Sequence, residues 1–167
     1  MLADGFGRIR ENVAYVLDGL TPEQLSYRID PDANPVSWLI WHLTRVQDDH
    51  VADAFGVTQV WSADGWARRF GLPPGTMAHG YGQTPEQVAE FAAATASAEL
   101  LGEYHEAVYA QTVKLVSEVA DADLDRIVDK RWTPPVTLGV RLVSVLDDDM
   151  QHVGQAAFAR GILLRRG

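Results

Sequence analysis

The stretch SVLDDDMQHVGQ, residues 144–155, places three consecutive aspartates and a histidine inside a segment that otherwise has the pattern of an apolar helix. Apolar residues recur at three- and four-residue spacings on both sides of it, which predicts one helix over about residues 137–164. A run of charges on a helix usually lies on the solvated face. Asp148 and His152, however, are four residues apart, so they are neighbours on one face and lie close to the apolar stripe.

A carboxylate and an imidazole at this spacing can both reach one metal ion, because side chains four residues apart project in the same direction. Asp149 is the alternative carboxylate, and Asp147 is turned further away and has the pattern of a solvated residue. The pair Asp-x-x-x-His also occurs on exposed helices. A metal site therefore requires at least one further ligand from another part of the chain.

A second helix supplies a candidate ligand in SWLIWHLTRVQDDH. His42 lies on an apolar stripe between two tryptophans, where a histidine without a polar partner is unfavourable. Such a residue is either a core histidine bonded to a backbone carbonyl or a metal ligand. Asp49 is two helical turns further on and returns to almost the same face, whereas His50 is rotated away and is expected to be solvated.

Helical periodicity extends over most of the chain. Besides the last helix, long helices are expected over about residues 3–20, 35–55 and 96–119. Asn34 can cap the second, with Pro35 at its first helical position, and Thr84 and Pro85 repeat this arrangement for a short helix. Four substantial helices in 167 residues predict an all-α fold, a four-helix bundle forming a single domain over residues 1–167.

One segment, residues 56–83, is rich in Gly, Pro and Trp and lacks sustained periodicity, so we expect a long loop between the second and third long helices. Its aromatic residues argue against disorder. The loop is either a packed structural segment or the wall of a pocket, in which Trp61 and Trp66 would stack on or shield a ligand.

Composition narrows the classes of function. The net charge of −9 disfavours nucleic acid and anionic membrane as partners, because both repel an acidic surface. No apolar run approaches the ~20 residues that cross a membrane, and the N-terminal residues lack the pattern of a signal peptide, so a cytoplasmic protein is expected. Cysteine is absent, which leaves His, Asp and Glu as metal ligands.

The segments NPVSWLIWHLTRVQDDH and DDDMQHVGQAAFARG together resemble the DinB/YfiT-like superfamily, which includes the mycothiol-dependent maleylpyruvate isomerases and thiol S-transferases of actinobacteria. The resemblance covers most of the chain. It implies a four-helix bundle with a divalent metal held by one histidine of the second helix and by a carboxylate and a histidine of the last long helix. Carried over to this sequence, the metal ligands are His42, Asp148 and His152, with Asp149 as the alternative carboxylate.

The resemblance also implies a function. We expect a metal-dependent transferase or isomerase that activates a low-molecular-weight thiol, such as mycothiol or bacillithiol, toward a small electrophile. Zinc is the expected metal, with nickel, iron or manganese as alternatives. Asp49 is the candidate catalytic residue, and Trp61 and Trp66 are candidates for cofactor binding. The alternative is a non-catalytic metal-binding bundle, for example a homodimer associated with stress or detoxification.

Overall fold

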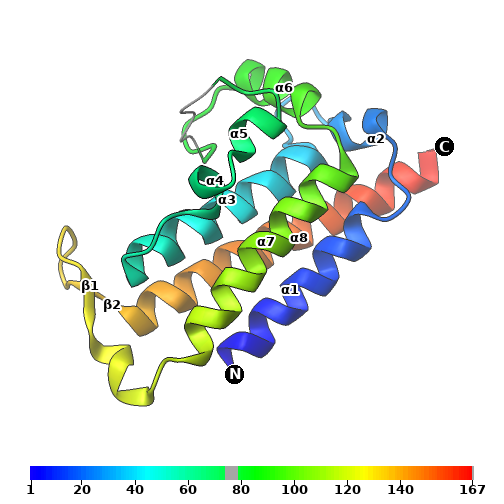
Figure 1. The fold of residues 1–167 in the computed structure, drawn as a ribbon. Coiled ribbons are helices and arrows are strands. Elements are labelled where there is room, and N and C mark those ends of the chain that lie inside the picture. Colours follow the sequence, from blue (N-terminus) through cyan, green and yellow to red (C-terminus); the bar gives the residue numbers. More distant parts are fainter. Residues whose placement is uncertain (74–78, 167) are drawn as a thin grey trace.

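Four long helices form the body of the protein (Figure 1). The structure is a computed structural model that describes residues 1–73 and 79–166. The long helices are α1 (Leu2–Leu17), α3 (Val36–Phe55), α7 (Ala98–Ser117) and α8 (Leu138–Arg166). Helix α1 packs against α7 and α8, and α3 packs against the same two helices, most extensively against α8. This arrangement confirms the predicted all-α four-helix bundle.

Helix α3 is the most enclosed of the four. It contacts α7, α8 and two shorter helices, α2 (Pro22–Ser26) and α6 (Pro85–Ala94). Its polar residues are therefore buried along with its apolar ones, including His42, Arg45 and Asp48. Buried polar groups need hydrogen-bond partners, so these side chains organise the structure around them.

The starts of three helices follow from local sequence. Thr84 caps α6 through a reciprocal capping box with Gln87, and Thr21 caps α2 with a similar box, as expected for a threonine placed before a proline. The prediction that Asn34 caps the second long helix was wrong. Pro35 is the last extended residue and the cap, and its carbonyl accepts the first helical hydrogen bond, from Leu39 N at 3.0 Å.

The segment between α3 and α7 holds two one-turn helices, α4 (Val60–Ala63) and α5 (Trp66–Arg69), before α6. The predicted long loop over residues 56–83 is thus ordered where it is described, and its residues 74–78 lie outside the described residues. Asp48 on α3 anchors this segment, because its carboxylate accepts hydrogen bonds of 2.8 Å from the backbone N–H groups of Val60 and Trp61.

A small hairpin precedes α8. After a 3₁₀-helix, η1 (Asp121–Asp125), the strands β1 (Ile127–Asp129) and β2 (Val136–Thr137) pair antiparallel, and Leu138 N donates to the carbonyl of Arg126 at 2.8 Å. The hairpin was not predicted, since strands this short carry no detectable alternation. The hairpin places the residues that connect its two strands over the first turns of α8.

Helix α8 is the longest element, at 29 residues. Its buried stripe includes Leu142, Val145 and Val153, and acidic and basic residues interrupt its exposed side. Within the described ranges, no helix combines the length and the apolar character needed to cross a membrane. Asp148 and His152 lie half-buried on the side of α8 that faces α3.

Candidate metal centre and adjoining cavities

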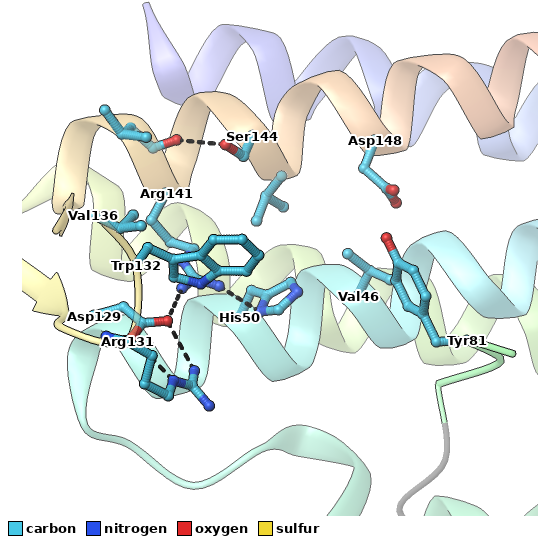
Figure 2. Close-up of a pocket in the computed structure, with 12 residues that line it drawn as sticks. Val46, His50, Tyr81, Asp129, Arg131, Trp132, Val136, Arg141, Ser144 and Asp148 are labelled. Atoms are coloured by element: carbon cyan, nitrogen blue, oxygen red, sulfur yellow. Dashed lines mark hydrogen bonds and ion pairs between the residues drawn. The ribbon is translucent and has the colours of Figure 1, made fainter. Parts of the chain in front are cut away.

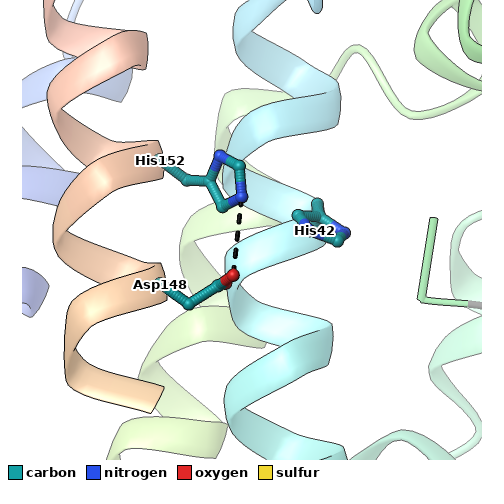
Figure 3. Close-up of side chains that lie close together, drawn as sticks. All are labelled: His42, Asp148 and His152. Carbon is teal, nitrogen blue, oxygen red and sulfur yellow. Dashed lines mark ion pairs between the residues drawn. The ribbon is translucent and has the colours of Figure 1, made fainter. Parts of the chain in front are cut away.

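The two most extensively packed helices bring three potential metal ligands together (Figure 3). His42 projects from α3, and Asp148 and His152 project from successive turns of α8. One ligand atom from each of these residues lies within 4.8 Å of the others. Two imidazole nitrogens and a carboxylate oxygen form a set suited to a divalent transition metal.

A backbone carbonyl orients the imidazole of His42. Nδ1 of His42 lies in hydrogen-bond contact with the carbonyl oxygen of His79. A carbonyl only accepts, so Nδ1 carries the proton and Nε2 presents a lone pair. Gly80 allows this close approach: its φ is +98°, and a Cβ there would lie 2.7 Å from Trp38 and 2.9 Å from His42 Nδ1. The indole of Trp38 stacks on the imidazole at 4.5 Å between ring centroids.

His152 is oriented in the same way from its own helix. Its Nδ1 lies 2.9 Å from Oε1 of Gln155, and its Nε2 lies 3.7 Å from Oδ1 of Asp148. Both histidines thus use Nδ1 for an outer hydrogen bond and leave Nε2 for a ligand, which is the usual arrangement of metal-binding histidines. Burial lowers the pKa of His42 and so favours the neutral imidazole, the form that binds metals.

The two neighbouring aspartates have different surroundings. Asp148 contributes to the three-residue group, and its Oδ2 is buried without a hydrogen-bond partner in the described part of the chain. Asp149 is fully buried, and neither of its oxygens has a partner there. Burial raises the pKa of Asp149 well above its usual value, with a smaller effect from Asp148. The residues of the group fit a divalent metal, and Asp148 supplies the carboxylate because one of its oxygens lies within 4.8 Å of a ring nitrogen of each histidine.

Two cavities border this group. One, of about 540 Å³, extends from Asp148 along α8 to the hairpin (Figure 2). The other, of about 290 Å³, is lined by His42 and His152. Tyr81 lines both cavities and has its ring edge-on to His42 at 5.8 Å. A ligand bound by the three residues is thus approachable from two sides.

A charged cluster forms the hairpin end of the larger cavity. The carboxylate of Asp129 accepts hydrogen bonds from Arg131 and Arg141, and Arg141 Nη1 donates to His50 Nδ1 at 2.7 Å. Trp132 lines the same end (Figure 2). Sequence reasoning missed these residues and expected His50 to be solvated. The only sequence signal was that Arg141 lies seven residues before Asp148, hence on the same helix face.

The other predicted site residues are not among the three candidate ligands. Asp49 borders a further cavity of about 520 Å³ together with His79, and its Oδ1 accepts a hydrogen bond of 2.6 Å from Gln59. Trp61 and Trp66 are 1% and 3% exposed and pack against Phe70 and Tyr104 in the core. These two tryptophans offer little surface to a ligand.

Comparison with known proteins adds three findings. Residues 1–164 match the model of the family described as mycothiol-S-transferase. A crystal structure of a conserved protein from Enterococcus faecalis superposes with a TM-score of 0.87 at 30% sequence identity, over 98% of this chain and 95% of the other. No protein of curated function matches the sequence.

Proposed function

The chain belongs to the mycothiol S-transferase family, and we propose that it transfers a low-molecular-weight thiol to a small electrophile with the help of a divalent metal held by His42, Asp148 and His152. The observation that carries the proposal is the convergence of these three side chains beside two cavities. Family membership confirms the resemblance found in the sequence. The bound metal and the reaction go beyond family membership and are what we propose.

The roles of the residues follow from their geometry. His42 and His152 direct Nε2 toward the shared space, and Asp148 supplies the third ligand atom. Three protein ligands leave room for an external one, as in catalytic zinc sites. A divalent metal at this point would lower the pKa of a coordinated thiol, so that thiolate forms at neutral pH. Zinc is the proposed metal, and nickel, iron and manganese accept the same ligand types.

The thiol must come from outside the chain, because the sequence contains no cysteine. Mycothiol is the proposed thiol and bacillithiol the alternative. In the transfer, the sulfur forms a bond to an electrophilic carbon while the leaving group departs with its electron pair, and the thiol proton passes to solvent or to a base. Asp49 is the proposed base, since it borders the cavity that also contains His79, whose carbonyl orients His42.

Much of the rate gain is expected from positioning. Holding thiolate and electrophile next to each other can supply several kcal/mol of the barrier, about 7 kcal/mol or more in the best cases. The two cavities provide this arrangement, because one opens at the histidines and the other at Asp148. Activity should therefore require both metal and thiol and should saturate with thiol.

A direct assay tests the proposal. The protein is incubated with mycothiol, bacillithiol or glutathione and with monochlorobimane or maleylpyruvate, with and without a chelator, and metal content is measured in parallel. Conjugation or isomerisation that stops on chelation and returns with metal supports the proposal. Equal rates after metal removal contradict it. Stoichiometric metal without turnover of any pair would instead favour the non-catalytic metal-binding bundle.

A further inference from the structure

The hairpin end of the larger cavity carries a surplus of positive charge. Asp129 lies between two guanidinium groups: Arg131 contacts it through Nε at 3.0 Å and Nη2 at 2.9 Å, and Arg141 through Nη2 at 3.0 Å. All three residues line the cavity. One carboxylate therefore faces two permanently charged guanidinium groups, and the cluster retains a net charge of about +1.

The hydrogen-bonding capacity left at this end consists mainly of donors. Both oxygens of Asp129 are already paired, and Oδ1 also accepts from the backbone N–H of Arg131 at 2.9 Å. Arg141 donates to Nδ1 of His50, so the proton of that imidazole lies on Nε2. Arg131 Nη1 and Arg141 Nε have no partner in the described part of the chain. A hydroxyl-rich ligand requires acceptors as well as donors, whereas a carboxylate requires donors alone.

The two arginines differ in exposure. The side chain of Arg131 is 79% exposed, whereas that of Arg141, which also lines the cavity, is 10% exposed. Asp49 and Asp53 also act on Arg131, from the neighbouring cavity, and both raise its pKa less than Asp129 does. Arg131 is therefore the arginine whose guanidinium a ligand can reach from solvent, and Arg141 is the buried member of the pair.

The cluster lies at a definite distance from the candidate metal centre. Arg141 and Asp148 are seven residues apart on α8, which corresponds to two turns, or about 10 Å along the helix axis. Figure 2 shows Asp148 and Tyr81 at one end of the cavity and Trp132 with the cluster at the other. The indole of Trp132 is 65% exposed and offers an apolar surface beside the charged cluster.

We propose that this cavity binds a carboxylate of the substrate, with Arg131 and Arg141 as specificity-determining residues and with the reacting atom of the same molecule directed toward Asp148. This inference rests on the proposed function in one respect, namely that the bound molecule then reacts at the metal centre. The carboxylate belongs either to the electrophile or to the thiol, and the experiment separates the two sources.

Binding is tested first, without any requirement for turnover. Metal-free protein is titrated with glutarate and with glutaramide, its neutral counterpart, while the indole resonance of Trp132 is followed by NMR. Glutarate is expected to bind about tenfold more tightly, as charge-assisted hydrogen bonds imply. Arg131→Gln should abolish most of this preference. Lys130→Gln, which removes an exposed positive charge at the adjacent position, should retain it.

Turnover then identifies the source. Mycothiol, which has no carboxylate, is assayed with 4-(chloromethyl)benzoate and with its methyl ester; the carbon–sulfur bond forms as chloride leaves with the electron pair of the carbon–chlorine bond, and the thiol proton passes to solvent. If the electrophile is recognised, Arg131→Gln raises KM about tenfold for the acid and leaves the ester unchanged. If the thiol is recognised, the variant instead raises KM for glutathione, which carries carboxylates, in reaction with the ester.

The outcomes separate this inference from the proposed function. Equal binding of glutarate and glutaramide, or equal effects of Arg131→Gln and Lys130→Gln, would overturn the carboxylate assignment. Turnover in which Arg131→Gln changes neither the KM for the acid nor the KM for glutathione would also overturn it. Absence of turnover with every pair counts against the proposed transferase, and the metal-free titration then decides the carboxylate site alone. Arg141→Lys, which keeps the charge and loses the planar fork, should show an intermediate preference for glutarate.

Discussion

The imidazole of His42 and the backbone carbonyl of His79 form a hydrogen bond across 37 residues of sequence. It joins the enclosed helix α3 to the segment before α6 and fixes which nitrogen of His42 faces Asp148 and His152. Outer hydrogen bonds of this kind hold metal-binding histidines in orientation and tautomer. The backbone at His79 is thus part of the candidate metal centre, even though the side chain of His79 is not one of the three ligands.

Gly80→Ala should weaken metal binding. The added Cβ would lie 2.7 Å from Trp38 and 2.9 Å from His42 Nδ1, so the carbonyl of His79 would have to move away from the imidazole. We expect metal affinity to fall about 10- to 100-fold. The measurement is a metal titration against a chromophoric chelator.

Gly82→Ala is the matched control for that experiment. Gly82 also has a positive φ, +72°, but an added Cβ there meets nothing within 4 Å. The Gly82→Ala variant places alanine in the same kind of unfavourable backbone conformation but makes no new contact with His42. It should therefore bind metal like the wild type. If both variants lose affinity equally, backbone strain rather than the orientation of His42 explains the result.

Asp148→Asn and Asp149→Asn should differ in metal content. Asp148 lies in the group of three ligands, whereas Asp149 is buried elsewhere in the helix packing. Loss of a ligand should cost more affinity than the roughly 10- to 100-fold typical of an outer hydrogen bond, while Asp149→Asn should retain the metal. Elemental analysis after dialysis measures both, with the exposed Asp147→Asn as a further control. The reverse pattern would assign the ligand to Asp149.

The long helices were predictable because their signals are local. Apolar residues at three- and four-residue spacings mark α8, and a threonine before a proline marks the start of α6. The five-residue helix α2 has the same Thr-Pro start but too few residues to show a periodicity. The hairpin β1–β2 was missed for a similar reason, since its strands have three and two residues.

The candidate site likewise has a part that the sequence predicts and a part that it does not. Asp148 and His152 are neighbours because of helix geometry alone, and His42 stood out as a polar residue on an apolar face. Arg131 and Trp132 reach the cavity only because the hairpin folds over the first turns of α8, which no local pattern encodes. Exposure to solvent is likewise a tertiary property, so the sequence did not reveal that Trp61 packs in the core.

Asp48→Ala should destabilise the protein strongly. The carboxylate is fully buried and accepts hydrogen bonds of 2.8 Å from the hydroxyl of Tyr104 and from two backbone N–H groups of α4, and it pairs with Arg45. Its removal takes a carboxylate away from a buried guanidinium, which typically costs about 3–5 kcal/mol. Urea denaturation measures the loss. Asp53→Ala, an exposed site on the same helix, should change the free energy of unfolding by less than about 0.5 kcal/mol.

His105 should make the stability of the protein depend on pH. Its Nδ1 lies 3.0 Å from the hydroxyl of Thr44, which itself donates to the carbonyl of Ile40, so Nδ1 carries the proton. Nε2 is buried without a partner in the described part of the chain. Protonation of Nε2 would place a second N–H where no acceptor is present, and burial accordingly lowers the pKa of His105 to about 4.

The sign of the effect follows from the unfolded chain, in which a histidine has a pKa of about 6.5. As the pH falls, the unfolded state binds a proton first, so the contribution of His105 to stability is complete above about pH 6.5 and is lost progressively toward pH 4. The full loss amounts to about 3 kcal/mol. His105→Gln should flatten this part of the pH dependence, measured as the free energy of unfolding in urea between pH 7 and pH 4. Parallel curves for His105→Gln and the wild type would show that His105 is not the source of the acid sensitivity.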